Sequence, residues 1–576
     1  MRSGTDELGL DSLVAVEIRS WFLKELTIEI PVLKILSGGS VSQLLDFAVE
    51  KIPAALTPKL NTNTPSTRDT SRLLLAPSAN NGSSDSGSIS KDDGSTDGHD
   101  TQSVSSAPTT DAGASVKEYT KTLPMSSGQT GFWVLKHLIK DETTSNITIS
   151  VVIEGNIRVN SMKSALATVA SRHEAFRSSF FVNDGHAPVQ AISDDSKLSL
   201  EIIRISDKAE VVTHYDALKS YVYKIEDGDC MRLVYLERSA QESYLLIGAH
   251  HIIMDGISLE IFLDELQRAY NHQTLPGPVY QYSDYSSRMV QDLKAGKMDS
   301  ELDYWKSQFV NQPLPLPLLE FASVKTRTPL MSYDYNSASR NVDATITKQV
   351  KYTCTTMKSN VFHLYLGVFE VLLYKLFNIN DLCIGMADAN RWDPQVAKSM
   401  GMYLNLLPLR FQLNGSQSFA TLLKNTRKTA YSAMSNSKVP FDVVLENVKF
   451  ERSTTHTPLF QAFINYRQGV DEKRKFGEAT ASTLNMSNAR TGYDISLDIF
   501  DNPSGDPRIV VMVQKQLYSS EDASRILDMY LKLLADLSFS PETAVEDVVL
   551  HAQPDVENAI HLGHGKLLFA FDDNLY

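Results

Sequence analysis

A stretch of low-complexity sequence divides this chain into parts that must fold separately. Residues 52–117 consist mainly of Ser, Thr, Asp, Asn, Gly and Pro, and no aromatic residue occurs between Phe47 and Tyr119. Such a segment cannot bury enough apolar surface to offset the conformational entropy that folding costs. We therefore predict a disordered tether, with a small domain before it and a larger globular region after it.

Bulk composition narrows the class of protein further. The chain has 576 residues, of which 42% are hydrophobic, so we expect more than one domain with a sizeable core. A formal net charge of −14 argues against nucleic acid or an anionic membrane as a partner. The three cysteines, Cys230, Cys354 and Cys383, lie far apart without metal-ligand spacing, which predicts free thiols in a reducing compartment. Because no signal peptide or long apolar run is present, we predict a cytoplasmic protein, and the abrupt start indicates a piece of a longer chain.

Candidate catalytic groups are concentrated in one strand and the turn after it. The apolar run Tyr244–Ala249 predicts a buried strand, which delivers His250 and His251 to a short turn that ends at Asp255 and Gly256. Apolar residues at helical spacing follow the turn. A histidine at the end of a rigid strand can act as a general base, because its ordinary pKa lies near neutrality. We expect Gly256 to adopt a backbone conformation that other residues resist.

The pattern alone leaves the role of each histidine open. Adjacent residues on a strand point to opposite faces, so at most one of the two should face a given cleft. A buried histidine is more often a hydrogen-bonded core residue than a catalytic one, and that is the structural alternative for both. Asp255 could hold the turn by pairing with a distant cation.

The run His250–Gly256 reads His-His-Ile-Ile-Met-Asp-Gly and resembles the HHxxxDG signature of the condensation domains of nonribosomal peptide synthetases. Other acyltransferases of the chloramphenicol acetyltransferase type share this signature. Further motifs resemble those of condensation domains in the same order along residues 119–545, and such a series is far more specific than one motif. They are Ser126–Trp133, Arg172–Arg177, Tyr282–Tyr285, Cys383–Arg391, Gly401–Arg410, Val439–Asp442 and His456–Gln461. Taken alone, Arg172–Arg177 predicts a solvated helix end.

A second resemblance lies before the tether. The run Leu8–Leu13 reads Leu-Gly-Leu-Asp-Ser-Leu and is similar to an acyl carrier protein of the polyketide type. By this resemblance, Ser12 carries a covalent 4′-phosphopantetheine arm. A phosphate ester at a helix N-terminus is electrostatically favourable, because free N–H groups and the helix dipole face it. The first helix of a carrier should precede Ser12, so we expect the carrier to be truncated.

The two resemblances together imply an α/β (α+β) fold. We expect a two-lobed, chloramphenicol-acetyltransferase-like condensation domain, preceded by a truncated all-α acyl carrier helical bundle and the disordered linker. The predicted segments are the C-terminal part of the carrier at 1–51, the linker at 52–117, the N-lobe at 118–310, the C-lobe at 311–545, and the start of a linker to a following module at 546–576.

The resemblance to condensation domains also implies residue roles. His251 is the active-site histidine, which either takes the proton of the attacking amine or orients the amine and stabilises the oxyanion. His250 packs or hydrogen-bonds to hold the loop. Asp255 pairs with an arginine, for which the motif position indicates Arg391, and Asn465 contacts the reacting groups. Neither a metal nor a nucleotide is needed, because the thioester supplies the driving force.

The predicted reaction joins a polyketide acyl thioester to the amino group of an aminoacyl thioester on a downstream peptidyl carrier. A polyketide-type carrier directly before a condensation domain is the arrangement of hybrid polyketide synthase–nonribosomal peptide synthetases, such as fungal ones. The implied partners are upstream polyketide synthase domains and downstream adenylation and peptidyl carrier domains.

Three alternatives stay open at this point. An epimerisation domain shares the twin-histidine signature, but it normally follows a peptidyl carrier. A free, ester-forming acyltransferase would use acyl-CoA and an alcohol, but the D-F-G-W-G element of the plant type is absent. The third alternative is a degenerate domain that only docks carriers. It stays open because the segment before Arg391 lacks the proline and last glycine of the family form near I-G-x-P-x-A-G-R.

Overall fold

The computed structural model describes most of the chain after the predicted tether. The described residues are 45–48, 119–183, 185, 187–450, 453–468, 473–502 and 505–551. The predicted attachment site Ser12, nearly all of the carrier region 1–51, the linker 52–117 and residues 552–576 lie outside the described residues.

The first lobe is built on a six-stranded mixed sheet with the twin-histidine strand near its middle. Strand β7 (Glu242–His250) pairs antiparallel with β2 (Asn146–Glu154), and the register sets His250 opposite Asn146. On its other side β7 pairs with β6 (Met231–Glu237). The full strand order is β12 (Arg474–Phe476), β13 (Ala479–Ser487), β2, β7, β6 and β5 (Leu200–Arg204).

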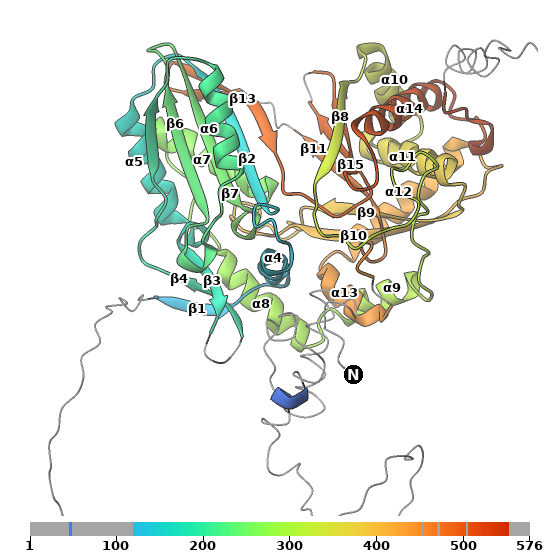
Figure 1. Cartoon of the computed structure of the whole chain (residues 1–576), viewed down its shortest axis with the longest axis horizontal. Coiled ribbons are helices and arrows are strands. Elements are labelled where there is room, and N and C mark those ends of the chain that lie inside the picture. The colour runs from blue at the N-terminus through green and yellow to red at the C-terminus, as the bar shows by residue number, and fades with distance from the viewer. Residues whose placement is uncertain are drawn as a thin grey trace, which may run out of the picture. The chain divides into compact units, whose positions relative to one another are not determined.

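Helices cover both faces of this sheet. Helices α5 (Val159–Arg172) and α7 (Gly256–Tyr270) pack together over one face, and α6 (Ala209–Lys219) lies against β2 and β7 on the other (Figure 1). Because side chains alternate along a strand, Ile247 joins the core under α5 and α7 while Leu246 joins the core under α6. A strand covered on both faces is apolar throughout, which is why Tyr244–Ala249 has no polar alternation.

A smaller element closes one end of the first lobe. Strands β1 (Lys121–Pro124), β4 (Pro188–Ile192) and β3 (Ser178–Val182) form a three-stranded antiparallel sheet. Helix α4 (Ser127–Leu138) follows β1 and begins with a capping box, in which the Ser126 side chain accepts from Gln129 N–H and the Gln129 side chain accepts from Ser126 N–H.

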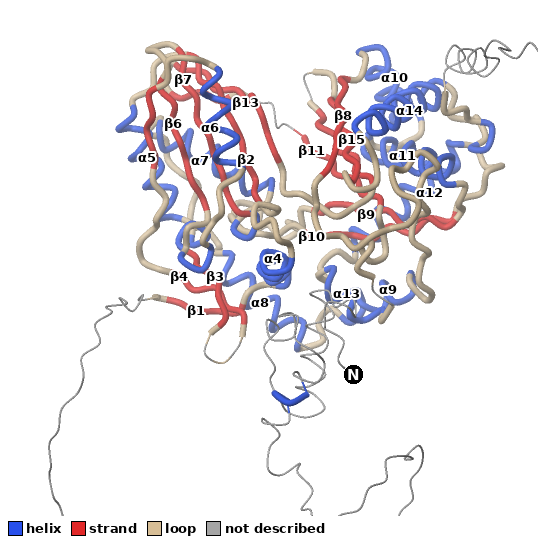
Figure 2. Tube along the Cα trace, viewed as in Figure 1, coloured by secondary structure: helices blue, strands red, loops and turns tan. Residues whose placement is uncertain are grey.

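The second lobe is built on another six-stranded mixed sheet. Its strand order is β10 (Asn405–Gln412), β9 (Asp381–Asp388), β11 (Ala462–Gln468), β14 (Ile495–Asp501), β15 (Arg508–Gln514) and β8 (Tyr335–Asn341). The helices that pack on it are α10 (Ala344–Thr356), α11 (Val361–Phe377), α12 (Phe419–Ser435) and α14 (Ser520–Phe539). Figure 2 shows these helices in blue beside the red strands. Helix α11 is almost entirely buried, which fits its apolar sequence on all sides.

Further helices lie outside the two sheets. Helices α8 (Tyr282–Lys294) and α9 (Asp299–Gln308) follow the first lobe in sequence, and α13 (Phe441–Val448) contacts α9. Among the described residues, no single helix has the length and apolar composition of a membrane span. Only α10 and α11 taken together reach them, and that pair is bent by 103°.

One hairpin crosses from the second half of the sequence into the first lobe. Strands β12 and β13 are joined by a tight turn at Gly477, and β13 pairs antiparallel with β2. The two lobes therefore share an element of sheet. The predicted lobe limits of 118–310 and 311–545 did not include this exchange, because alternation of apolar residues indicates a strand but not the sheet that it joins.

Candidate active site

His250 is the last residue of β7, and it is a buried, neutral side chain. It is 1% exposed, and its Nδ1 accepts a hydrogen bond from Ile252 N–H at 3.2 Å. Burial lowers its pKa to about 3. Its Nε2 has no hydrogen-bond partner among the described residues. The geometry therefore suits a side chain that holds the turn after the strand.

His251 begins the short 3-10 turn His251–Ile253 and is half-buried. Its N–H donates to the carbonyl of Ser145 at 2.9 Å, which ties the turn to the start of β2. Burial lowers the pKa of the imidazole, and Arg467 lowers it further, while the Asp255 carboxylate and the carbonyls of His251 and Met254 raise it. A neutral imidazole at neutral pH is the form that can accept a proton.

Phe132 of α4 lies against both histidines. Its ring stacks on the His251 imidazole with centroids 4.8 Å apart and planes tilted by 11°, and it meets His250 edge-on at 6.4 Å. Sequence reasoning missed Phe132, because an apolar side chain in a helix carries no chemical signal. The only available sign was its position beside Trp133 in a recognised motif.

Asp255 caps α7 and joins the two lobes. Its Oδ1 accepts from Ser258 N–H and Ser258 Oγ, both at 2.8 Å. Arg391 of the second lobe donates to both carboxylate oxygens, at 2.9 and 3.2 Å, and Tyr403 N–H donates to Oδ2 at 3.1 Å. The side chains of Asp255 and Arg391 are only 3% and 7% exposed. The predicted partner of Asp255 thus lies where the motif position indicated, and the cap on α7 is an additional role.

Arg391 is held on its other side by its own lobe. Its guanidinium donates to the carbonyls of Val396 and Ser399 at 2.9 and 2.6 Å and lies 4.3 Å from the centre of the Tyr403 ring. The missing proline and glycine before Arg391 have not prevented this arrangement. Carbonyl contacts and a stacked ring fix the guanidinium independently of those two residues.

Gly256 differs from its prediction. It is the first residue of α7 and has no positive φ, so the expectation of an unusual backbone conformation was wrong. The first helical position takes ordinary helical angles, which suit any residue. A Cβ atom placed at Gly256 would meet nothing within 4 Å, so the glycine leaves open space beside the turn.

Motif residues from both lobes converge around this turn. Ser258 Oγ donates to the carbonyl of Gly401 at 2.8 Å and accepts from Gly401 N–H at 3.0 Å. Tyr282 OH donates to the carbonyl of Met402 at 2.7 Å and lies 2.6 Å from Ser126 Oγ. Motifs that are far apart in sequence therefore meet in one hydrogen-bonded junction.

Asn465 lies on β11, beside Asp498 of the parallel strand β14. Burial raises the pKa of Asp498, and Arg467 and the Asn465 side chain lower it. No hydrogen bond between described residues joins Asn465 to His250 or His251. Arg467, which sequence reasoning missed, connects β11 to the histidine through its charge. The sequence around Arg467 gives no sign that this arginine lies close to His251 in the folded chain.

The segment after α5 is buried rather than solvated. His173 is 1% exposed, and its Nε2 lies 2.7 Å from Glu265 of α7. Arg172 also reaches Glu265, at 3.2 Å. The prediction of a solvated helix end was therefore wrong, because two of its polar groups pair with a buried acid on the neighbouring helix. This contact helps to fix α7, which begins at the candidate site.

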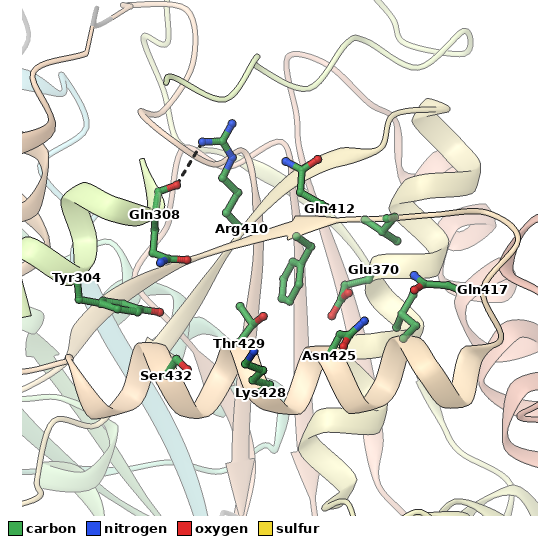
Figure 3. Close-up of a pocket in the computed structure, with 13 residues that line it drawn as sticks. Tyr304, Gln308, Glu370, Arg410, Gln412, Gln417, Asn425, Lys428, Thr429 and Ser432 are labelled. Carbon is green, nitrogen blue, oxygen red and sulfur yellow. Dashed lines mark hydrogen bonds between the residues drawn. The ribbon is translucent and has the colours of Figure 1, made fainter. Parts of the chain in front are cut away.

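A separate cavity of about 390 Å³ lies in the second lobe, between α12 and the end of β10 (Figure 3). Its floor includes Glu370 of α11, which is 2% exposed and whose pKa is raised well above its ordinary value by burial. Its lining holds neither a histidine nor a cysteine. The residues are Tyr304, Gln308, Glu370, Arg410, Phe411, Gln412, Leu413, Gln417, Leu422, Asn425, Lys428, Thr429 and Ser432.

The lobe junction is therefore the better candidate for catalysis. It holds a half-buried histidine, an ion pair and polar groups from several elements, whereas the cavity lining holds a buried acid, amides, hydroxyls and the cations Arg410 and Lys428 but no histidine. Among the described residues, no group of three or more His, Cys, Asp or Glu side chains could hold a metal ion.

Two family models match this chain. The condensation domain model matches residues 119–558, and the phosphopantetheine attachment site model matches residues 4–48. Together they cover both regions that the sequence motifs indicated, on either side of the tether. The predicted 4′-phosphopantetheine arm agrees with the second match, which includes Ser12 within its span.

Curated relatives match nearly the whole chain. It is 52% identical over 585 residues to the hybrid PKS-NRPS synthetase xenE of Xenoacremonium sinensis, covering 99% of this chain and 15% of that protein. It is 50% identical over 586 residues to the hybrid PKS-NRPS synthetase pydA of an Acremonium species, covering 99% of this chain and 14% of that protein. The chain thus spans about 15% of the length of the curated relatives that it matches.

Solved structures match the described lobes. The condensation domain from the Monacolin K polyketide synthase MokA aligns with a TM-score of 0.69 and 28% identity, covering 74% of this chain and 100% of that one. The first condensation domain of the calcium-dependent antibiotic synthetase aligns with a TM-score of 0.65 at 15% identity, covering 76% of this chain and 100% of that one. The predicted two-lobed α/β fold is confirmed.

Proposed function

Since the chain belongs to the condensation domain family, we propose that it forms an amide between an acyl group and an amino acid that are both held on carriers. The donor is a polyketide acyl thioester on the arm of Ser12. The acceptor is the amino group of an aminoacyl thioester on a downstream peptidyl carrier. The amine nitrogen bonds to the thioester carbon, the C–S bond breaks, and the proton that nitrogen loses ends on the departing thiol.

The half-buried imidazole of His251 at the lobe junction carries this proposal. Burial lowers its pKa, so it is uncharged at neutral pH and able to take a proton from the attacking amine. The thiol that leaves can receive the same proton, so the histidine ends the reaction as it began. A neutral imidazole can also orient the amine, and its N–H can stabilise the tetrahedral oxyanion.

The other site residues support His251 in this proposal. His250 holds the turn, and Asp255 with Arg391 fixes the start of α7 against the second lobe. Gly256 keeps space open beside the turn. Asn465 is proposed to contact the reacting groups from β11, on the strand that also presents Arg467.

The identity of the donor rests on the carrier and on the relatives. The run Leu8–Leu13 has the polyketide form, and both relatives described above are named as hybrid synthetases. We propose a carrier over residues 1–51, a tether over 52–117 and a condensation domain over 118–545. The proposed partners are polyketide synthase domains upstream and adenylation and peptidyl carrier domains downstream. A cytoplasmic location is in keeping with the three buried free cysteines.

A transfer assay read by intact protein mass tests this function. The chain is mixed with a complete donor carrier bearing a simple acyl thioester and with a peptidyl carrier bearing an amino acid. The expected product is an acyl-aminoacyl species on the peptidyl carrier, with the donor carrier returned to its free thiol. Supplying the donor as a separate carrier avoids dependence on the carrier region of this chain.

Parallel reactions separate the alternatives. Acyl-CoA with a simple alcohol tests for an ester-forming enzyme, and a peptidyl thioester followed by analysis of its stereochemistry tests for epimerisation. Ester formation or epimerisation without amide formation would refute the proposal. A chain that binds loaded carriers but transfers nothing from any of several acyl groups would also refute it.

A further inference from the structure

The imidazole of His251 has no side-chain partner that sets the plane of its ring. No side chain of the described residues hydrogen-bonds to its buried Nδ1, and the backbone carbonyls of His251 and Met254 are the groups that bear on the ring and raise its pKa. In a Ser-His-Asp triad, a carboxylate holds the histidine through that nitrogen. Here the nearby carboxylate of Asp255 is occupied by Ser258, Arg391 and Tyr403. Besides these carbonyls, a contact with the face of the ring can therefore orient it.

Phe132 makes that contact. Its ring lies nearly parallel to the imidazole, with 4.8 Å between centroids and 11° between planes. Parallel rings at this distance attract each other and exclude water from the surface between them. The stack covers one face of His251. The same ring meets His250 edge-on, so one side chain bears on both histidines.

The helix that carries Phe132 is fixed from both lobes. Ser126, the cap of α4, lies 2.6 Å from the hydroxyl of Tyr282, which in turn donates to the carbonyl of Met402. Ser127 Oγ donates to the carboxylate of Asp442 in α13. A Cβ atom at Gly128 would come within 3.1 Å of the Met402 side chain, so α4 already lies close to the second lobe. Phe132 is thus held in place by contacts that His251 itself lacks.

We propose that Phe132 is the positioning residue of His251, doing with an apolar ring what a carboxylate does in a hydrogen-bonded dyad. It fixes the plane of the imidazole and keeps one of its faces dry. The relevance of this contact to catalysis rests on the proposed function of His251. The contact itself can be measured in the resting protein.

The charged groups around His251 and its burial determine how its pKa should change when the ring of Phe132 is removed. Asp255 faces it from the start of α7, Arg467 from β11 and His250 from β7, while α4 contributes Phe132 and also carries Lys136, whose charge lowers the pKa of His250. Burial is the largest of the causes that lower the imidazole pKa. Admitting water at the stacked face should therefore raise this pKa toward its ordinary value of 6.5.

The decisive variants are Phe132→Leu, which removes the ring, and Phe132→Tyr, which keeps it. We expect Phe132→Leu to lower kcat for amide formation about 10-fold with little change in KM, because a misaligned base affects the reaction step more than substrate binding. The acid limb of its pH–rate profile should move to higher pH. Phe132→Tyr should restore both the rate and the profile.

A second readout does not depend on the reaction. Diethyl pyrocarbonate acylates neutral imidazole, and peptide mass spectrometry reports its rate at His251 as a function of pH in the whole chain. We expect His251 to react several-fold faster in Phe132→Leu than in the wild type, with a higher pH midpoint. This result would support the stacking role even if the proposed reaction proved wrong.

The matched control is Phe176→Leu. Phe176 is a buried phenylalanine that lies edge-on to another buried histidine, His173, at 6.2 Å. This variant removes the same atoms from the same core, so it reports the general cost of a lost ring, and its His251 should react as in the wild type. The proposal is overturned if Phe132→Leu melts like Phe176→Leu but leaves the acylation rate and the pH midpoint of His251 unchanged. Equal changes at His251 in both variants would overturn it as well.

Discussion

The lobe junction and the cavity of the second lobe both bury a titratable side chain, but the lobe junction is the one that resembles an active site. Burial lowers the pKa of His251 at the junction and raises the pKa of Glu370 in the cavity, so in both cases it favours the uncharged form. The surroundings differ. His251 lies among Asp255, Arg467 and a stacked ring, whereas among the described residues the pKa of Glu370 is shifted, besides burial, by the hydroxyl of Thr426.

This difference shows that a shifted pKa indicates burial and does not by itself identify a functional residue. At the junction, Arg391 and Tyr403 of the second lobe and Ser258 of the first donate hydrogen bonds to one carboxylate, that of Asp255, four residues after His251. In the cavity, the guanidinium of Arg410 donates to the carboxylate of Asp381 and to the carbonyl of Asn311. It also donates to the carbonyl of Gln308 (Figure 3). Convergence of groups from both lobes beside one neutral histidine distinguishes a candidate site from an isolated buried acid.

The largest effect is expected from His251→Ala. Loss of a general base typically costs about 10²- to 10⁴-fold in rate, so amide formation in the two-carrier assay should nearly stop. The fold should persist, because the histidine is half-buried and its backbone N–H still bonds to Ser145. Single-turnover rates and a thermal melt check both statements. A folded His251→Ala chain that condenses at the wild-type rate would refute the assignment.

The next effect compares two arginine–aspartate pairs, one in each region. Arg391→Gln leaves Asp255 buried without its cation, and breaking such a pair costs about 3–5 kcal/mol of unfolding free energy. Arg410→Gln breaks a pair whose aspartate is 38% exposed, so we expect a loss of only about 1 kcal/mol.

Chemical unfolding of both variants measures this contrast. Because Asp255 also caps the helix beside His251, Arg391→Gln should lose activity together with stability, while Arg410→Gln should keep its activity. Equal losses of stability in the two variants would show that the junction is no more dependent on its ion pair than the cavity is.

The smallest effect is expected from Glu370→Gln. Burial raises the pKa of Glu370 above its ordinary value of 4.5, so above that pH the folded protein keeps a proton that the unfolded chain releases. Wild-type stability therefore falls with rising pH through this group, and the variant escapes that fall. Glu370→Gln should gain stability relative to the wild type between pH 5 and pH 8.

Unfolding midpoints at the two pH values test this sign. Amide formation should stay within about twofold of the wild type, because the cavity is independent of the junction. A variant that loses condensation activity while remaining folded would move the functional site toward the cavity.

The sequence predicted those residues of the candidate site whose own side chains are charged or titratable. His251, Asp255 and Arg391 carry charge or titrate, and their motifs meet at the junction. Phe132 and Arg467 could not be foreseen, because their importance lies in distances across elements that spacing along the chain does not encode. The prediction of an unusual backbone conformation for Gly256 was wrong, because a glycine after an aspartate can begin a helix as well as form a turn.

The fold shows the same division. The unbroken apolar run before the histidines predicted a buried strand, and the helical spacing of apolar residues after the turn predicted a helix. The pairing of β12 and β13 with the sheet of the first lobe could not be predicted, because the sequence pattern of a strand does not identify the strand that it pairs with. The carrier motif at Ser12 lies outside the described residues, so its placement remains a prediction.

One labelling experiment tests most directly whether the junction receives the acyl thioester. Bromoacetyl pantetheine, with an amide in place of the thioester, presents an electrophilic carbon where the acyl group would lie. A neutral imidazole displaces its bromide, forming an N–C bond and releasing a proton. Peptide mass spectrometry of the whole chain then locates the adduct. We predict a stoichiometric adduct on His251. Labelling of Lys428 or another cavity residue, with His251 unmodified, would contradict the account.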